Sequence, residues 1–421
     1  MKTNIVICGA GIIGVATAYY LSKKYRKGSI VLIDKQQPLS FTTSKSGENF
    51  RDYWPQQCMT DFSTRSINLM EELRAEFGEE AFKMEYSGYD FISKNKGNPI
   101  FSSRTVEKEN STALNEITNE DEIKEKNKAL SDDVKKVIEI KKAGNVDVQA
   151  LGNLLLKQAK KNGVQFVEGE IVAIEKNENY SIKIKERETT IQSDKLVIAV
   201  GPFLNEIAQM VDLEFPIENI VQRKFIIPDP EKIIDSKMPF TIYADEQYLD
   251  WTEEEKIFLE EEQSDYWLLN KFPGGLHVKP DSGGIKMGWA FNRQKEINPK
   301  WEIERMDLFP NVVLKGASRF IPELKKYEDD IPTPLIQYAG YYTRTKENWP
   351  IIGPSKDRNI FIVGAFSGFG TMTACAAGEL CADYIVGKQV LPSYAAYFHP
   401  NRYDNASIMK EIIASENDGQ L

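Results

Sequence analysis

The chain has 421 residues, 41% of them hydrophobic and 28% charged, and its formal net charge is −10 at pH 7. This length and composition predict two or three globular domains, and the acidic balance argues against a nucleic-acid partner. Two histidines and four scattered cysteines, without a Cys-x-x-Cys pair, predict a cytoplasmic setting and no metal site. No stretch reaches the roughly 18 consecutive apolar residues of a membrane span, so we expect none.

The N-terminus carries the most informative pattern. An apolar strand runs into a Gly-x-Gly-x-x-Gly motif at residues 9–14 and a helix, and a second apolar strand then ends at Asp34. Gly9 permits a tight turn, Gly11 lets the backbone approach a pyrophosphate, and Gly14 lets the helix pack closely on the strand. The helix N-terminus offers unpaired N–H groups to the phosphates, and Asp34 can accept hydrogen bonds from a ribose. The pattern therefore predicts a dinucleotide-binding site.

The segments that follow are of two kinds. The first kind alternates helices and strands after a polar loop at 42–54. Helices are predicted at 61–77 and 148–162, a strand at 165–174, a hairpin at 181–192, and buried strands at 195–200 and 359–364. Other strands are predicted at 86–92 and, in a mainly antiparallel sheet, at 266–269, 276–278 and 284–289. The charged stretch 107–142 is expected to form solvated helices and loops on an outer face, without chemistry.

This order predicts an α/β (α+β) fold with a discontinuous nucleotide domain. The nucleotide-binding domain is predicted to comprise residues 1–85, 146–215 and 331–421. A second domain, built on a mainly antiparallel sheet, is predicted to comprise residues 86–145 and 216–330.

Further motifs carry a more particular family resemblance. They are the Thr43-Ser44…Arg51 loop, the strand at 197–202, the segment at 283–288, the Tyr341-Tyr342-Thr343 run and the turn at 364–370. With these motifs the chain resembles, over nearly its whole length, the D-amino-acid oxidase-like superfamily of FAD enzymes, in the branch of sarcosine oxidases and dimethylglycine dehydrogenase. The resemblance implies a Rossmann-like FAD-binding domain, a separate substrate domain, and FAD as the cofactor.

The expected cofactor contacts combine the N-terminal motif with the resemblance. The positive end of the helix after the turn at 366–370 would stabilise negative charge on reduced flavin. Gly340 stands where several sarcosine oxidases carry the cysteine that links the flavin, which implies non-covalent FAD. We expect these residues to hold the cofactor: Gly9, Gly11, Ile12, Ile13, Gly14, Asp34, Lys35, Thr43, Ser44, Val172, Gly201, Gly340, Gly364, Phe366, Ser367, Gly368, Phe369, Gly370, Thr371 and Met372.

Lys286 is the first candidate for a catalytic role. Strand alternation places it on the face opposite Ile285 and Met287, which by itself is typical of a lysine pointing to solvent. The resemblance implies instead that Lys286 lies under the flavin, where its charge helps oxygen to accept electrons.

Three other residues are further candidates. The planar guanidinium of Arg51 can bind a substrate carboxylate or a flavin phosphate. His277 is a candidate base or hydrogen-bond donor, and Tyr342 is a candidate of similar standing. Met372 stands where the related enzymes carry a lysine that binds the substrate carboxylate, so the substrate can differ from sarcosine.

The resemblance implies an FAD-dependent oxidoreductase that oxidises the C–N bond of a secondary or tertiary amine. We expect an N-methylated or cyclic amino acid as substrate, hydride transfer to flavin N5, and O2 or an electron-transfer protein as acceptor. Two alternatives stay open. One is an FAD-dependent 2-hydroxy acid oxidoreductase, in which His277 acts as general base, and the other is a non-catalytic, flavin-bound assembly factor.

Overall fold

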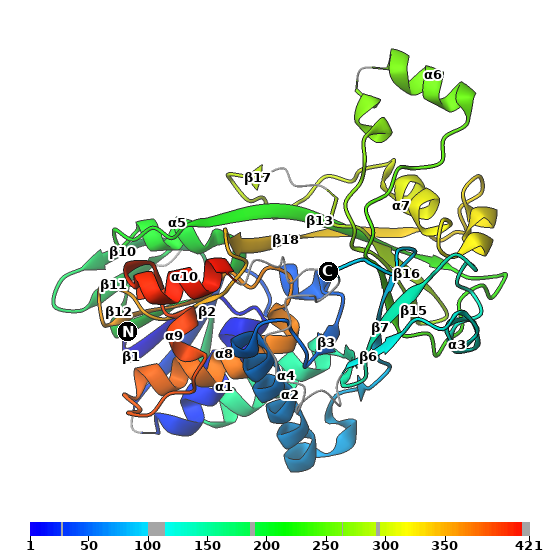
Figure 1. Ribbon diagram of the computed structural model, residues 1–421. Helices are drawn as coiled ribbons and strands as arrows, with labels where there is room; N and C mark the ends of the chain where they lie inside the picture. Colours follow the sequence, from blue (N-terminus) through cyan, green and yellow to red (C-terminus); the bar gives the residue numbers. More distant parts are fainter. Residues whose placement is uncertain (27, 100–113, 186–189, 263, 292–294, 415–421) are drawn as a thin grey trace.

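Two large β-sheets organise the chain (Figure 1). This computed structural model describes residues 1–421 except 27, 100–113, 186–189, 263, 292–294 and 415–421. The long strands β13 (Ile217–Pro228) and β18 (Ile336–Thr345) pair with each other and extend from the side of the first sheet into the second (Figure 1).

The first sheet has a parallel centre. It consists of β1 (Lys2–Cys8), β2 (Ile30–Asp34), β9 (Gln165–Glu168), β12 (Ile191–Ile198) and β20 (Ile360–Gly364), with antiparallel strands β10 (Ile171–Lys176), β11 (Tyr180–Ile184) and β19 (Ile351–Pro354) at its side. β1 lies between β2 and β12, so the loops that follow these strands meet at one edge. The central strands are apolar because both faces of the sheet are covered.

Helices cover one face of this sheet closely. α1 (Ile12–Lys24) packs between α4 (Val148–Lys161) and α8 (Gly370–Ile385), and α2 (Gln57–Phe77) packs on α8. Gly378 permits the α1–α8 approach, since a Cβ there would lie 2.6 Å from the carbonyl carbon of Ala16. α5 (Leu204–Gln209) contributes to the core on the opposite face.

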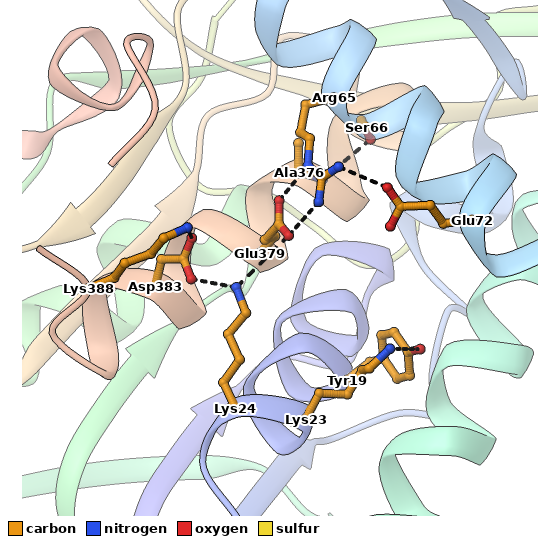
Figure 2. A network of polar contacts seen from close by, with 10 residues as sticks. All are labelled: Tyr19, Lys23, Lys24, Arg65, Ser66, Glu72, Ala376, Glu379, Asp383 and Lys388. Atoms are coloured by element: carbon orange, nitrogen blue, oxygen red, sulfur yellow. Dashed lines mark hydrogen bonds and ion pairs between the residues drawn. The ribbon is translucent and has the colours of Figure 1, made fainter. Parts of the chain in front are cut away.

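Charged side chains tie these helices together (Figure 2). Arg65 of α2 makes two hydrogen bonds of 2.8 Å to Glu379 of α8, and Lys24 at the end of α1 pairs with Asp383. Lys388 also reaches Asp383, at 3.0 Å. A two-bond arginine–carboxylate contact fixes orientation as well as charge. The network therefore anchors the C-terminal half of α8 and helps to fix where its first turn lies.

The second sheet is mainly antiparallel, in the order β17-β13-β16-β15-β14-β5-β7-β6, with β18 also paired to β13. Its other strands are β17 (Lys295–Glu296), β16 (Gly284–Gly288), β15 (Leu276–Asp281), β14 (Phe240–Tyr243), β5 (Tyr89–Ser93), β7 (Lys136–Ile140) and β6 (Leu114–Ile117). One face buries Phe225, Ile227 and Met287 in a core shared with α7 (Phe309–Ala317). The alternate residues of these strands form the opposite, more polar face.

Smaller elements complete the described chain. β3 (Asn49–Arg51), β8 (Ala143–Val146) and β4 (Met84–Glu85) form a three-stranded sheet. Further helices are α3 (Glu120–Lys126), α6 (Glu253–Glu261), α9 (Ala395–Phe398) and α10 (Ala406–Ala414), and 3-10 turns are η1 (Thr42–Lys45), η2 (Glu79–Ala81), η4 (Gly201–Phe203), η5 (Tyr266–Leu269), η6 (Pro322–Tyr327) and η7 (Pro400–Asp404). α6 stands away from the body of the molecule (Figure 1).

The predicted α/β architecture with a mainly antiparallel second sheet is confirmed, whereas three local predictions are wrong. The loop at 42–54 contains η1 and β3. Residues 266–269 form η5 instead of a strand, and Leu268 is buried there while its carbonyl accepts a 3.1 Å hydrogen bond from the Trp251 indole. The charged stretch 107–142 includes β7, which pairs with β5 and β6 and is largely buried, while 107–113 lie outside the described residues.

Three further predictions concern a hairpin, the domain boundaries and membrane spans. β11 and β12 form the hairpin predicted at 181–192, of which 186–189 lie outside the described residues. β18 belongs to the predicted nucleotide segment 331–421 but pairs with β13 of the second sheet, and the domain boundaries stay predictions. Within the described ranges, no helix combines the length and apolar character needed to cross a membrane.

Candidate functional site

A cavity of about 1520 Å³, partly open to solvent, lies where the two sheets meet. Its wall comes from the β1–α1 turn, the end of β2, the 37–47 segment, the β12–η4 junction, β13, β18 and the β20–α8 turn. Sites of this kind form at the carboxyl ends of parallel strands, where connecting loops diverge.

The β1–α1 turn depends on its glycines. Gly9 has φ +98°, and a Cβ there would lie 2.4 Å from the Ala199 carbonyl oxygen. A Cβ on Gly14 would lie 1.9 Å from the Gly9 carbonyl oxygen. Gly11 begins α1 without a side-chain cap, and Thr43 of η1 accepts a 3.0 Å hydrogen bond from the Ile12 N–H. The helix N-terminus therefore opens on the cavity with a hydroxyl already beside it.

Asp34 braces this turn from the end of β2. Its carboxylate accepts hydrogen bonds from the Ala10 N–H at 2.7 Å and from the Gln36 N–H at 3.0 Å. Burial raises the pKa of Asp34, and the backbone hydrogen bonds oppose that shift. The Lys35 ammonium lies 4.6 Å from the Trp301 ring centroid, so an aromatic ring with a cation over it closes the same end of the cavity.

The β20–α8 turn supplies the opposite wall. Gly368 has φ +90°, and a Cβ there would lie 2.4 Å from the Tyr342 ring. The Ser367 N–H donates to the Thr343 carbonyl at 2.9 Å, which ties the turn to β18. The hydroxyl of Thr371, in the first turn of α8, forms a 2.8 Å hydrogen bond with the hydroxyl of Ser46. A second helix N-terminus thus reaches the cavity.

Most of the predicted cofactor residues line this cavity. They are Gly9, Gly11, Ile12, Ile13, Asp34, Lys35, Thr43, Gly201, Gly340, Gly364, Phe366, Ser367, Gly368, Gly370 and Thr371. Gly14, Ser44, Val172, Phe369 and Met372 do not. Phe369 and Met372 belong to the core behind the turn, and Val172 is 41% exposed. The β10–β11 register shifts between Ile171 and Ala173, and it is Ile171 that lines the cavity.

Several lining residues were not predicted. They include the aromatic residues Phe41, Phe203 and Trp301 and the polar residues Gln222 and Lys224. Phe203 and Trp301 stack with centroids 5.1 Å apart. Gln222 and Lys224 stand two residues apart in β13 and therefore share one face of the strand, and this spacing of two polar residues in a strand is a signal in the sequence that could have pointed to Lys224.

Of the four catalytic candidates, Tyr342 lines the cavity. Burial raises its pKa to about 12, so the phenol stays neutral. Lys286 does not line the cavity, and its ammonium forms an ion pair with Asp281 on the same sheet face. The position under the flavin that the resemblance implied for Lys286 stays a prediction.

Arg51 and His277 are not part of the cavity lining. The Arg51 guanidinium lies 4.1 Å from the Trp54 ring centroid and 5.2 Å from that of Phe91, and burial lowers its pKa to about 10. His277 Nδ1 lies 3.1 Å from the Gly275 carbonyl oxygen. Its Nε2 is buried without a hydrogen bond to another described residue. Burial, then the charge of Lys224, lowers the pKa of His277 to about 3, so the imidazole is neutral.

The sequence profile of the FAD-dependent oxidoreductase family matches residues 4–384. The chain belongs to this family. The predicted resemblance to D-amino-acid oxidase-like enzymes and the predicted FAD cofactor are thereby confirmed. The residues of the cavity fit FAD, because two helix N-termini, a glycine cradle and the Asp34 carboxylate line one continuous space.

Relatives of this FAD-dependent oxidoreductase include an L-saccharopine oxidase from Schizosaccharomyces pombe, 26% identical over 227 residues, which are 49% of this chain and 52% of that protein. The chain thus matches about half the length of this curated relative. An L-proline dehydrogenase from P. horikoshii has a TM-score of 0.75 at 23% identity, with 96% of this chain and 98% of that chain covered. A glycine oxidase from Geobacillus kaustophilus has a TM-score of 0.74 at 15% identity, with 94% and 97% covered. These two structures share the fold.

Proposed function

We propose that this FAD-dependent oxidoreductase oxidises the C–N bond of an amino acid whose nitrogen is a secondary or tertiary amine. One observation carries the proposal. The buried Arg51 guanidinium lies 4.1 Å from the centroid of the Trp54 ring, and Trp54 in turn packs at 5.2 Å on Phe369, next to the β20–α8 turn that lines the cavity. A buried guanidinium next to neutral phenols suits a substrate carboxylate. The names of the relatives, which specify saccharopine, proline and glycine, support an amino-acid substrate.

The residues around Tyr342 favour a neutral amine. Bound FAD supplies the acceptor for a hydride from the carbon next to nitrogen, and the nitrogen lone pair then forms the C=N bond of an iminium product that water hydrolyses. In our proposal Arg51 attracts the carboxylate from beside the cavity, while the neutral phenol of Tyr342 in the wall and the neutral imidazole of His277 nearby provide a low-polarity environment that lowers the pKa of the substrate ammonium. This reaction requires no strong base. A 2-hydroxy acid oxidase does require one, and a histidine with a pKa of about 3 is poorly suited to that role.

Cofactor attachment follows from the same residues. We propose non-covalent FAD, because Gly340 presents no thiol to the cavity and the cysteines Cys8, Cys58, Cys375 and Cys381 are buried. The acceptor is proposed to be O2 or an electron-transfer protein. For an oxidase, a lysine ammonium near the flavin would stabilise developing superoxide. Lys224, which lines the cavity, is better placed for this than the ion-paired Lys286.

Anaerobic reduction of the purified holoprotein tests this function. N-methyl and cyclic amino acids are expected to bleach the visible absorption of bound FAD, whereas matched 2-hydroxy acids are expected to leave it unchanged. Arg51→Lys keeps a positive charge but loses the planar fork, so it should raise the substrate concentration for half-maximal reduction. Bleaching by hydroxy acids alone would replace the proposal with the alcohol reaction, and no bleaching by any substrate would favour a non-catalytic flavoprotein.

A further inference from the structure

Three lysines share the polar face of the second sheet. The strand registers place His277 opposite Gly288, Lys279 opposite Lys286, and Lys224 opposite Gly288. Paired residues in antiparallel strands lie on the same face, as do residues two apart along a strand. Lys224, Lys279 and Lys286 therefore form one cluster, and each is at most 9% exposed. Buried lysines are uncommon unless they have partners.

Two of the three ammonium groups have partners within the protein. Lys286 is ion-paired with Asp281. Lys279 donates to the Gly47 carbonyl at 2.8 Å and to the side-chain oxygens of Asn49 at 3.0 Å and Asn145 at 2.5 Å.

Lys224 differs from both. It makes no hydrogen bond or ion pair with another described residue, although its ammonium lies 5.7 Å from the centroid of the Tyr342 ring. Lys224 also lines the cavity, as do Gly47, Gly340 and Tyr342.

The surroundings of Lys224 are built to hold its side chain in place. A Cβ on Gly288 would lie 3.0 Å from Lys224 Cγ and 2.6 Å from His277 Nε2, so glycine is required for both side chains to occupy this face. A Cβ on Gly47 would lie 3.6 Å from Lys224 Cε, which shows that the 46–48 loop passes over the lysine stem. The ammonium is therefore held at the cavity wall by packing along its stem.

The charge balance around Lys224 is unfavourable without an anion. Burial, and then the charge of Lys286, lowers the pKa of Lys224 to about 8. The nearby carboxylates act on the other two lysines, since Asp281 pairs with Lys286 and Glu48 interacts electrostatically with Lys279 and Lys286. A buried cation without a counter-charge is destabilising, and a carboxylate from a ligand would remove that penalty.

We propose that the substrate is an acidic N-substituted amino acid whose second carboxylate binds Lys224, while Arg51 holds the first. This inference rests on the proposed amine oxidation and names its substrate class. The Lys224 ammonium faces the Tyr342 ring at 5.7 Å, and both residues line the cavity, while burial raises the pKa of Tyr89, which Arg51 and Tyr342 also influence. The neutral Nε2 of His277, an acceptor when Nδ1 donates to Gly275, lies beside Lys224 across Gly288.

Matched substrates test this without any variant. N-methyl-L-glutamate and N-methyl-L-glutamine, and the corresponding aspartate and asparagine compounds, differ in one carboxylate replaced by an isosteric amide. We would measure, under anaerobic conditions at neutral pH, the concentration of each compound that gives half-maximal flavin reduction. For the better of the two acids we expect this concentration to be about 10- to 100-fold lower than for its amide, a ratio typical of a charged hydrogen bond. Equal half-saturation for acid and amide at both lengths would overturn the inference while leaving amine oxidation intact.

Variants of Lys224 assign the effect to this residue. Lys224→Met keeps the stem length and should bring the acid-to-amide ratio close to one, whereas Lys224→Arg should retain a preference for the acid. Lys136→Met is a matched control, because Lys136 is a buried lysine of β7 that donates to the Asn98 carbonyl at 3.1 Å. If Lys224→Met retains the full acid preference, or loses only the rate of reoxidation by O2, the lysine does not bind the carboxylate.

A binding readout separates this inference from the proposed chemistry. Succinate, glutarate and adipate are not oxidised, but the tightest of them should perturb the flavin spectrum and raise the Tm of the wild-type holoprotein. Lys224→Met should weaken that binding about 10-fold or more. If no amine reduces the flavin while a dicarboxylate still binds through Lys224, the proposed function fails and the anion site stands. If no dicarboxylate binds, the anion site fails.

Discussion

Asp34 offers a quantitative test of how the protein holds FAD. Its carboxylate accepts hydrogen bonds from Ala10 at 2.7 Å and Gln36 at 3.0 Å and also lines the cavity. Asp34→Ala removes a charged acceptor for the ribose, which is typically worth about 1.5–3 kcal/mol. Since about 1.4 kcal/mol is tenfold in Kd, the variant should bind FAD roughly 10- to 150-fold more weakly.

The same change should weaken the protein without its cofactor. The Ala10 N–H loses its acceptor, and an unsatisfied buried donor costs about 1–3 kcal/mol. We would measure Kd by fluorescence titration of apoprotein with FAD, and Tm by calorimetry. Asp194→Ala is the control, because that carboxylate accepts a hydrogen bond of 2.8 Å from Asn4 and does not line the cavity. Wild-type FAD affinity in Asp34→Ala, or an equal loss in Asp194→Ala, would refute the assignment.

Three further predictions address the opposite wall and the cofactor bond. Gly368→Ala forces a side chain to 2.4 Å from the Tyr342 ring at φ +90°, so it should lose FAD on gel filtration; full retention would contradict the packing. Lys286→Met leaves the Asp281 carboxylate without its ion-pair partner and should lower the Tm. The rate of flavin reoxidation in air should fall less in Lys286→Met than in Lys224→Met, and a larger fall in Lys286→Met would support a position of Lys286 under the flavin. Acid or SDS should release all flavin as free FAD, and a yellow denatured band would show a covalent bond.

The parts of the site that could be predicted are those formed by short, continuous segments of the chain. Gly9, Gly11 and Asp34 occupy a strand–turn–helix–strand unit whose geometry is local, so spacing alone places them at the cavity. The turn at 364–370 was predicted for the same reason. The side chains of Phe369 and Met372, which were also expected at the cofactor, pack in the core behind the turn, and sequence spacing does not show which side of a turn a side chain faces.

The residues that could not be predicted depend on contacts between distant segments. Trp301 reaches the cavity through stacking on Phe203, and Lys224 does so through the pairing of β13 with β16 and β18. Val172 was expected at the cofactor, but β10 has an irregular register between Ile171 and Ala173, and Ile171 is the residue that lines the cavity. Lys286 was assigned by resemblance, and the resemblance gave no information about its partner Asp281.

Anaerobic titration of the holoprotein with a panel of N-substituted amino acids tests the central claim most directly. The account predicts that at least one secondary amine carrying two carboxylates bleaches the FAD absorption to completion, and that one iminium-derived carbonyl product forms per flavin reduced. The account would be contradicted if FAD stayed oxidised with every amine, whether a 2-hydroxy acid bleached it or no compound did.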